Sequence, residues 1–294
     1  MVRTMNRVRS VLVAGAGGRL GGPIVEQLTA RGLQVTATYR TERDGLPDRI
    51  AAIGARPIQA DLRDADGMRR LLAGVDAAIF ATALDASASA ARVLPDGQPA
   101  VFVSSNNVGR DTQSPHYRKM ARAEAAIRET APWAVILRPT LIYGGKDDKN
   151  LLRMMRIIQR YPVVLRPWSD ALQQPVFYRD LAQVAVQMAC EPDRAGGTVS
   201  VAGPDIVTQG DLMAHLIRAL GVRRIVLPVP IPTALAAARL AQRLGLARPA
   251  LLRQLRRALQ DKRAQGPDII TTRTHLETGL KDLAESLPSR KPSL

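Results

Sequence analysis

The chain of 294 residues carries 42 Lys and Arg against 26 Asp and Glu, a formal net charge of +16, and 46% of it is hydrophobic. This apolar fraction supplies a core and excludes a disordered chain. The single cysteine, Cys190, excludes an internal disulfide framework and fits a reducing compartment. No apolar run approaches the roughly 20 residues of a membrane span. The basic segment 1–10 leads directly into a predicted strand, with no separate signal-peptide core, so we expect a cytoplasmic protein.

The excess of basic residues is compatible with three kinds of partner: nucleic acid, an anionic membrane surface or an acidic small molecule. An arginine-rich surface without any such partner gives the same balance. Aromatic residues make up only 3% of the chain, whereas RNA-binding proteins commonly stack bases on aromatic side chains. The sequence therefore predicts a small-molecule ligand and no nucleic-acid partner.

Apolar runs alternate with helical patterns through the first half of the chain. Strands are predicted at 10–16, 33–40, 55–62, 75–82, 99–105 and 133–139. Helices are predicted at 21–32, 64–74 and 114–131, with a short polar helix before the third strand. Strands that are apolar throughout and separated by helices indicate a parallel sheet covered on both faces.

Helix ends support these boundaries. Asp64 and Ser114 are suited to N-caps, and Pro23 and Pro115 stand in the first turns of their helices. Gly32 is suited to the end of the first helix.

The alternation loosens after Gly145. Helices are predicted at 150–161, 208–221, 233–245 and 249–263, with an extended segment leading into a helix over 173–191. A short strand is predicted at 196–205 and a proline-bounded extended segment at 223–232. We expect an α/β fold: a Rossmann doubly wound parallel sheet over 8–145, to which later residues add strands. A smaller C-terminal α/β substrate-binding part follows over 146–285, then a flexible tail over 286–294. The oligomeric state stays open.

The segment 11–22, VLVAGAGGRLGG, joins the first strand to the first helix. Gly15, Gly18 and Gly21 follow the spacing G-x-x-G-x-x-G. Glycines here permit a tight turn and let the backbone approach a pyrophosphate, which the positive end of the helix attracts. Such a loop also serves as a plain turn, but a second strand ending about 20 residues on favours dinucleotide binding.

The end of the second strand bears on which dinucleotide binds. An acidic residue there would hydrogen-bond the ribose 2′-hydroxyl of NAD, but the chain has Tyr39 and Arg40, with Arg43 nearby. Arg19 in the glycine loop adds a second guanidinium suited to a 2′-phosphate. The sequence therefore favours NADP over NAD, the alternative being that Arg40 is an ordinary solvated residue.

Further cofactor contacts are expected in the glycine loop and at the ends of the neighbouring strands. They comprise Gly17, Leu20, Asp61, Leu62, Ala81, Ser104 and Pro139. Asp61 and the Leu62 amide are placed to border an adenine, although helix capping competes for the acidic residues of this segment, above all at Asp64. No metal site is predicted.

Together these motifs resemble the extended and atypical short-chain dehydrogenase/reductases. The resemblance covers about residues 8–245 and rests on GAGGRLG, ADLRD, VFVSSNNVG, ILRPTLIYG and PVFYRDLAQVA. LRPTLIYG, QQPVFYRDLA and AGPDIVTQGDLM are most similar to the group related to the NAD(P)-binding accessory subunit of respiratory complex I, and NmrA-like NADP sensors are also similar. The resemblance implies a Rossmann fold, a cofactor at the carboxyl ends of the strands and a substrate pocket closed by the C-terminal region.

Enzymes of this family use a serine after a strand and Tyr-x-x-x-Lys on the next helix. Ser105 matches the serine, and counting back from Glu124 puts the tyrosine and lysine positions at His116 and Met120. The usual lysine, which supports proton transfer by the tyrosine, is therefore replaced.

Two neighbouring residues are alternative candidates. Tyr117 and Lys119 flank the family positions, but residues two apart point to different sides of a helix. Histidine commonly serves in acid–base catalysis near neutral pH, which makes His116 a candidate, and an unremarkable first-turn role is the alternative.

One further position, which bears on the substrate, differs from the sugar-nucleotide epimerases. Those enzymes carry an asparagine after Arg-Pro, near the slot that Leu141 fills here. The segment 150–168, with Trp168, supplies apolar side chains for a pocket or for the core.

We therefore expect an NADP-dependent oxidoreductase or epimerase-like enzyme acting on a small carbonyl or alcohol. Its candidate catalytic residues are Tyr117, Ser105, His116 and Lys119. The alternative is a non-catalytic NADP-binding protein with a regulatory or structural role, which the substituted tyrosine and lysine positions motivate.

The basic C-terminal stretch 238–263 forms an apolar stripe at helical spacing. The stripe comprises Leu240, Leu244, Leu251, Leu252, Leu255 and Leu259. Peripheral membrane contact through this stripe is one interpretation. Packing on the protein itself is favoured, because aromatic anchors are missing.

Overall fold

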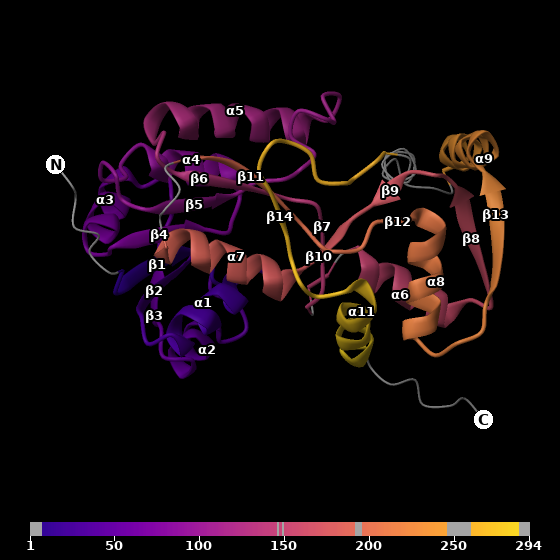
Figure 1. Cartoon of the computed structure of the whole chain (residues 1–294), viewed down its shortest axis with the longest axis horizontal. Helices are drawn as coiled ribbons and strands as arrows, with labels where there is room; N and C mark the ends of the chain where they lie inside the picture. Colours follow the sequence, from indigo (N-terminus) through magenta and orange to yellow (C-terminus); the bar gives the residue numbers. More distant parts are fainter. Residues whose placement is uncertain (1–7, 146, 149, 192–195, 246–259, 288–294) are drawn as a thin grey trace. The chain divides into compact units, whose positions relative to one another are not determined.

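The computed structural model describes residues 8–145, 147–148, 150–191, 196–245 and 260–287 (Figure 1). The chain divides into two compact units. The first comprises Met1–Pro139, Tyr178–Val201 and Gln265–Ile270, and the second comprises Thr140–Phe177, Ala202–Ala264 and Thr271–Leu294. Later segments therefore return to the first unit.

An eight-stranded sheet with the order β14-β11-β6-β5-β4-β1-β2-β3 organises the first unit. Its strands are β1 Ser10–Ala14, β2 Gln34–Tyr39, β3 Arg56–Gln59, β4 Ala77–Phe80, β5 Ala100–Val103, β6 Val135–Pro139, β11 Gly197–Ala202 and β14 Ile269–Thr271. The pairs from β3 through β11 are parallel. Strand order reverses between β1 and β4, which opens a crevice at their carboxyl ends. The predicted α/β Rossmann fold is confirmed.

Helices cover both faces of this sheet. They are α1 Gly21–Ala30, α2 Leu46–Ala52, α3 Ala65–Ala73, α4 Leu84–Ala91, α5 Pro115–Thr130 and α7 Tyr178–Cys190. Helix α1 packs beside α7 and α4 beside α5, on opposite sides of the strands (Figure 1). The α4 segment, LDASASAA, was not among the predicted helices. Six of its eight residues are buried, so its small side chains pack closely without the polar face that marks an amphipathic helix.

The helix ends agree with the sequence in all but one detail. Asp64 caps α3, its carboxylate accepting a hydrogen bond from the Gly67 N–H at 3.1 Å. Gly32, with φ +74°, follows the end of α1 as predicted. Ser114 occupies the N-cap position of α5, but the predicted hydroxyl cap is wrong, since no side-chain cap bond forms there. Its N–H donates instead to the Asp111 carboxylate at 3.1 Å.

A buried ionic cluster fastens α5 to the sheet. Glu124 is only 1% exposed. Its carboxylate accepts bonds from Ser104 Oγ at 2.5 Å, Arg138 Nε at 3.0 Å and Arg128 Nη2 at 3.4 Å. We call these four residues the Glu124 cluster. It joins the residue after β5 and strand β6 to the middle of α5, and so fixes where α5 begins relative to the strand ends.

The second unit is built from short paired strands and four described helices. β7 Leu141–Tyr143 pairs with β10 Pro175–Phe177, β8 Val163–Trp168 with β13 Ile225–Pro230, and β9 Leu172–Gln173 with β12 Val207–Thr208. The helices are α6 Leu151–Arg160, α8 Gln209–Ala219, α9 Ile231–Arg243 and α11 Leu276–Glu285. In the described parts of the chain, no helix combines the length and the hydrophobicity that crossing a bilayer requires.

Part of the predicted C-terminal organisation falls elsewhere. A helix is predicted over 249–263 and a tail over 286–294. Most of both falls on residues 246–259 and 288–294, outside the described residues. The helix prediction is wrong at its end, because residues 260–263 are not helical and Lys262 forms an isolated parallel bridge with Gln173.

Removing the charge from the Glu124 cluster tests its structural role. In Glu124→Gln the side chain keeps its shape while Arg138 loses its carboxylate partner. We expect the free energy of unfolding in urea to fall by about 3 kcal/mol, as when a buried pair loses one member. The matched control is Glu129→Gln, on the exposed side of the same helix, which should change it by less than about 0.5 kcal/mol. Equal stability of the two variants would contradict the assigned role.

Candidate functional site

The glycine loop after β1 is shaped by two close contacts that exclude side chains. Gly15 has φ +88°, and a Cβ there would lie 2.8 Å from the carbonyl oxygen of Ala81, which follows β4. A Cβ on Gly21 would overlap the carbonyl oxygen of Gly15. Glycine at these two positions therefore lets the first turn of α1 press against the ends of β1 and β4.

Gly17 and Gly18 have a different environment. Both are exposed. A Cβ on Gly17 would meet only the flexible end of Leu46, and one on Gly18 would lie 3.2 Å from the Gly15 oxygen. Packing alone gives a weaker reason for glycine at these positions, whereas a bare backbone beside the start of α1 fits an approaching diphosphate.

The arginines predicted to bind the adenosine 2′-phosphate lie in the loops after β1 and β2. Arg40 is exposed directly after β2, and its carbonyl accepts a hydrogen bond from Gln59 Nε2 at 3.1 Å. Arg43 is also exposed, on the loop before α2, and Arg19 is half-buried in the glycine loop. β1 and β2 are neighbours, so the loops that carry Arg19 and Arg40 leave the same edge of the sheet.

The residues predicted near the adenine have different environments in the structure. Leu20 is buried at the N-cap position of α1. The Asp61 carboxylate accepts a bond from the Arg63 N–H at 3.0 Å, which shapes the turn after β3. Leu62 packs its side chain into the core, 7% exposed, so only its backbone is left for a ligand.

Ser105 and Tyr117 are each hydrogen-bonded to Asn107, a residue that the sequence analysis did not select. The Asn107 N–H donates to Ser105 Oγ at 3.3 Å, and Asn107 Nδ2 donates to Tyr117 Oη at 2.9 Å. We call these three residues the linked group. The only indication of this group in the sequence was the run of polar residues after the strand, in VFVSSNNVG. Ser104 faces the other way, into the Glu124 cluster, and Pro139 ends β6 with its carbonyl accepting the Asn106 N–H at 2.9 Å.

The remaining catalytic candidates point elsewhere or to solvent. Lys119 Nζ lies 2.8 Å from the Asp85 carboxylate at the start of α4, and this hydrogen bond holds the pKa of Asp85 below its usual value. Met120, in the family's lysine position, packs against the hydrophobic core. His116 is exposed, its ring edge-on to Tyr117 with centroids 5.1 Å apart. Helix α5 therefore offers Tyr117 no lysine at the family position.

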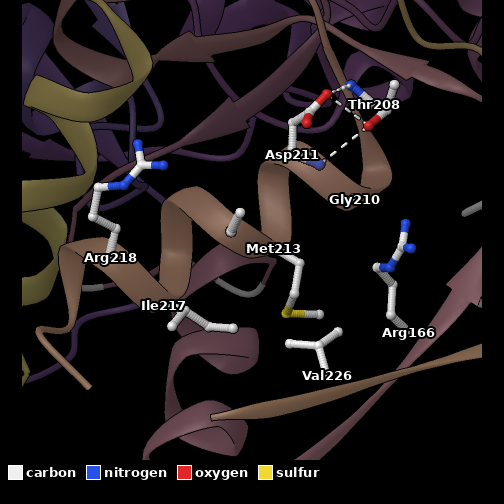
Figure 2. Close-up of a pocket in the computed structure, with 9 residues that line it drawn as sticks. Arg166, Thr208, Gly210, Asp211, Met213, Ile217, Arg218 and Val226 are labelled. Carbon is white, nitrogen blue, oxygen red and sulfur yellow. Dashed lines mark hydrogen bonds between the residues drawn. The ribbon is translucent and has the colours of Figure 1, made fainter. Parts of the chain in front are cut away.

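The second unit contains a cavity of about 570 Å³ between α8 and the strands β8 and β13 (Figure 2). Met213 and Val226 face each other in its wall, and Arg166 enters from β8. Asp211 and Thr208 bind one another as a capping box at the start of α8. Hydrogen bonds from the Thr208 hydroxyl and N–H lower the Asp211 pKa. Because this carboxylate caps the helix, the cavity offers an apolar wall and two arginines, Arg166 and Arg218, rather than an acid–base pair.

Comparison with known proteins decides what the first unit is. A family model described as NAD(P)H-binding matches residues 15–156, from the first loop glycine into α6. The chain carries an NAD(P)-binding Rossmann domain. The resemblance drawn from the motifs is thus confirmed, and the chain is related to the extended short-chain dehydrogenase/reductases.

The relatives of this NAD(P)-binding protein fall into two groups. It is 26% identical over 233 residues to "NADH dehydrogenase [ubiquinone] 1 alpha subcomplex subunit 9, mitochondrial" of Dictyostelium discoideum, covering 73% of this chain and 65% of that one. Over 85 residues, 27% of this chain and 26% of the other, it is 41% identical to dTDP-4-dehydro-6-deoxy-D-allose reductase of Streptomyces bikiniensis. The chain thus spans less than two thirds of the length of its complex I relative.

A solved structure shows the same fold along nearly the whole chain. The dTDP-glucose 4,6-dehydratase of Bacillus anthracis str. Ames, in complex with NAD, superposes with a TM-score of 0.66 at 13% identity. It covers 94% of this chain and 96% of its own.

The contact between Gly21 and Gly15 can be tested with a neighbouring glycine as control. In Gly21→Ala the new methyl group must displace the loop, so we expect a loss of about 2 kcal/mol of stability and of NADPH binding. In Gly22→Ala the nearest atom, the Ala16 oxygen, lies 3.9 Å from the new Cβ, so folding and binding should survive. Thermal melting and NADPH fluorescence titration measure both. A Gly21→Ala variant that binds as well as Gly22→Ala would refute the assigned geometry.

Proposed function

We propose that the protein is an NADP-dependent oxidoreductase or epimerase-like enzyme whose acid–base residue is Tyr117. The observation that carries the proposal is the linked group of Ser105, Asn107 and Tyr117. It follows β5, one strand from β4, whose end borders the glycine loop. Such a group places a hydroxyl and a phenol where a proton can be transferred, whereas a purely structural nucleotide site needs only the glycine loop.

Different residues of the chain bind different parts of the cofactor. The glycine loop and the start of α1 hold the diphosphate. Arg19 and Arg40, which follow the neighbouring strands β1 and β2, hold the 2′-phosphate that distinguishes NADP from NAD. Bound NADP(H) supplies or accepts a hydride at its nicotinamide.

Proton transfer falls to the linked group. The Tyr117 hydroxyl gives its proton to a substrate carbonyl oxygen, or takes one from an alcohol in the reverse direction. Ser105 Oγ hydrogen-bonds the same oxygen. The proposed substrate is a small carbonyl or alcohol, since Leu141 fills the slot where sugar-nucleotide epimerases carry asparagine.

A second candidate function is non-catalytic. Met120, packed against the core in the lysine position, and the relationship to a complex I subunit support a protein that binds NADP structurally or as a sensor. Stable NADPH binding without oxidation by any aldehyde, ketone, quinone or enone would favour this function over the enzyme.

The choice of NADP depends on Arg40. In Arg40→Ser the 2′-phosphate loses a charge-assisted hydrogen bond worth about 1.5–3 kcal/mol, so the Kd for NADPH should rise about 10- to 100-fold. The Kd for NADH should not change. Arg56→Ser is the control, since Arg56 is exposed at the opposite, amino end of β3. Calorimetry that shows equal losses for NADPH and NADH would contradict the assignment.

The enzyme proposal depends on Tyr117. Tyr117→Phe removes only the hydroxyl, so NADPH should bind as before while NADPH oxidation by a reducible carbonyl falls at least about 100-fold. Tyr161→Phe is the control, because Tyr161 is exposed in the second unit. Undiminished turnover in Tyr117→Phe would exclude it as the proton donor.

A further inference from the structure

The backbone of Asn107 is held in a tight turn after β5. Its N–H donates to Ser105 Oγ at 3.3 Å, and its carbonyl accepts from the N–H groups of Arg110 and Asp111, each at 3.1 Å. Gly109, with φ +82°, lets the chain close this turn. Three bonds thus fix the Cα of Asn107, and with it the direction in which the side chain leaves.

The side chain of Asn107 makes a directed contact with the phenol. Its amide nitrogen donates to Tyr117 Oη at 2.9 Å. The phenol oxygen is therefore an acceptor in this bond, and its own hydrogen points away from Asn107. An amide donor also stabilises the negative charge that develops on this oxygen as a proton leaves.

The one lysine of α5 is committed elsewhere. Lys119 pairs with Asp85, which also accepts a bond from Arg63 at 3.1 Å. The family position is filled by Met120, which packs against the core. Helix α5 therefore supplies no lysine to support the tyrosine electrostatically, and among the described residues we look for another donor.

We propose that Asn107 is the positioning residue that replaces the missing lysine. It holds the Tyr117 hydroxyl at the carboxyl end of β5 and stabilises the phenolate formed when the proton passes from Tyr117 Oη to the substrate oxygen. Solvent then returns a proton to the phenolate. This inference rests on the proposed function, because it requires that Tyr117 transfers a proton.

The hydrogen bond can be observed without any substrate. In protein labelled with ¹³Cζ-tyrosine, the carbon signal of Tyr117 reports what its oxygen binds, and Tyr117→Phe assigns it among the five tyrosines. We expect Asn107→Leu to move this signal and leave the other four in place. The control is Asn150→Leu, at an exposed asparagine of the second unit, which should leave the Tyr117 signal unchanged. An unchanged Tyr117 signal in Asn107→Leu would overturn the proposal.

The functional consequence is measured with an isosteric variant, which also covers a failure of Asn107→Leu to fold. Asn107→Asp keeps the size of the side chain but replaces the donor by a negatively charged acceptor. With NADPH and 9,10-phenanthrenequinone as the probe, kcat should fall about 100-fold. The KM for NADPH and the melting temperature should stay at wild-type values.

The possible failures are distinguishable. An active wild type whose Asn107→Asp variant keeps full kcat overturns the role of Asn107 and leaves the enzyme proposal standing. A wild type that binds NADPH but oxidises none of it, with this quinone or the wider panel, contradicts the proposed function and removes the proton transfer that this inference requires.

Discussion

The close approach of Gly21 to the carbonyl of Gly15 is the constraint on which the nucleotide site depends. No side chain fits between them, so α1 starts directly against the end of β1. The helix end, with its unpaired N–H groups and positive dipole, is thereby placed beside the crevice where strand order reverses. Any widening of this contact would withdraw the amides from a diphosphate.

A second constraint acts at the end of β5, where two consecutive serines serve opposite purposes. Because successive residues of an extended chain point to opposite sides, Ser104 turns inward and Ser105 turns toward Asn107. The inward side is anchored by Glu124, only 1% exposed, and by Arg138. The buried charge cluster thus fixes α5, and α5 in turn presents Tyr117 to the linked group. Stability and the proposed chemistry are joined through one helix.

The fold followed from the sequence where local patterns are strong. Six apolar runs, the glycine spacing and caps such as Asp64 all act over a few residues, and the structure contains the corresponding elements. Helix α4 was missed because alanine and serine give no contrast between its faces. Strands of two or three residues, such as β9 and β7, are too short for a period of two to be recognised.

The candidate site could be predicted only in part from the sequence, for a different reason. Glycines and arginines are identified by type and spacing, but Asn107 gains its role from a turn that brings it 2.9 Å from Tyr117, ten residues on. The pairing of Lys119 with Asp85 likewise joins two helices far apart in sequence. Tertiary contacts of this kind decide which of several plausible side chains meet, and no local pattern encodes them.

The proposed function requires that the first unit binds a nicotinamide dinucleotide through its glycine loop. Isothermal titration of the purified wild-type protein with NADPH, and separately with NADH, measures this directly. We expect saturable binding at one site per chain, tighter for NADPH because of the arginines after β1 and β2. Absence of any binding heat with both dinucleotides, at several temperatures, would contradict it.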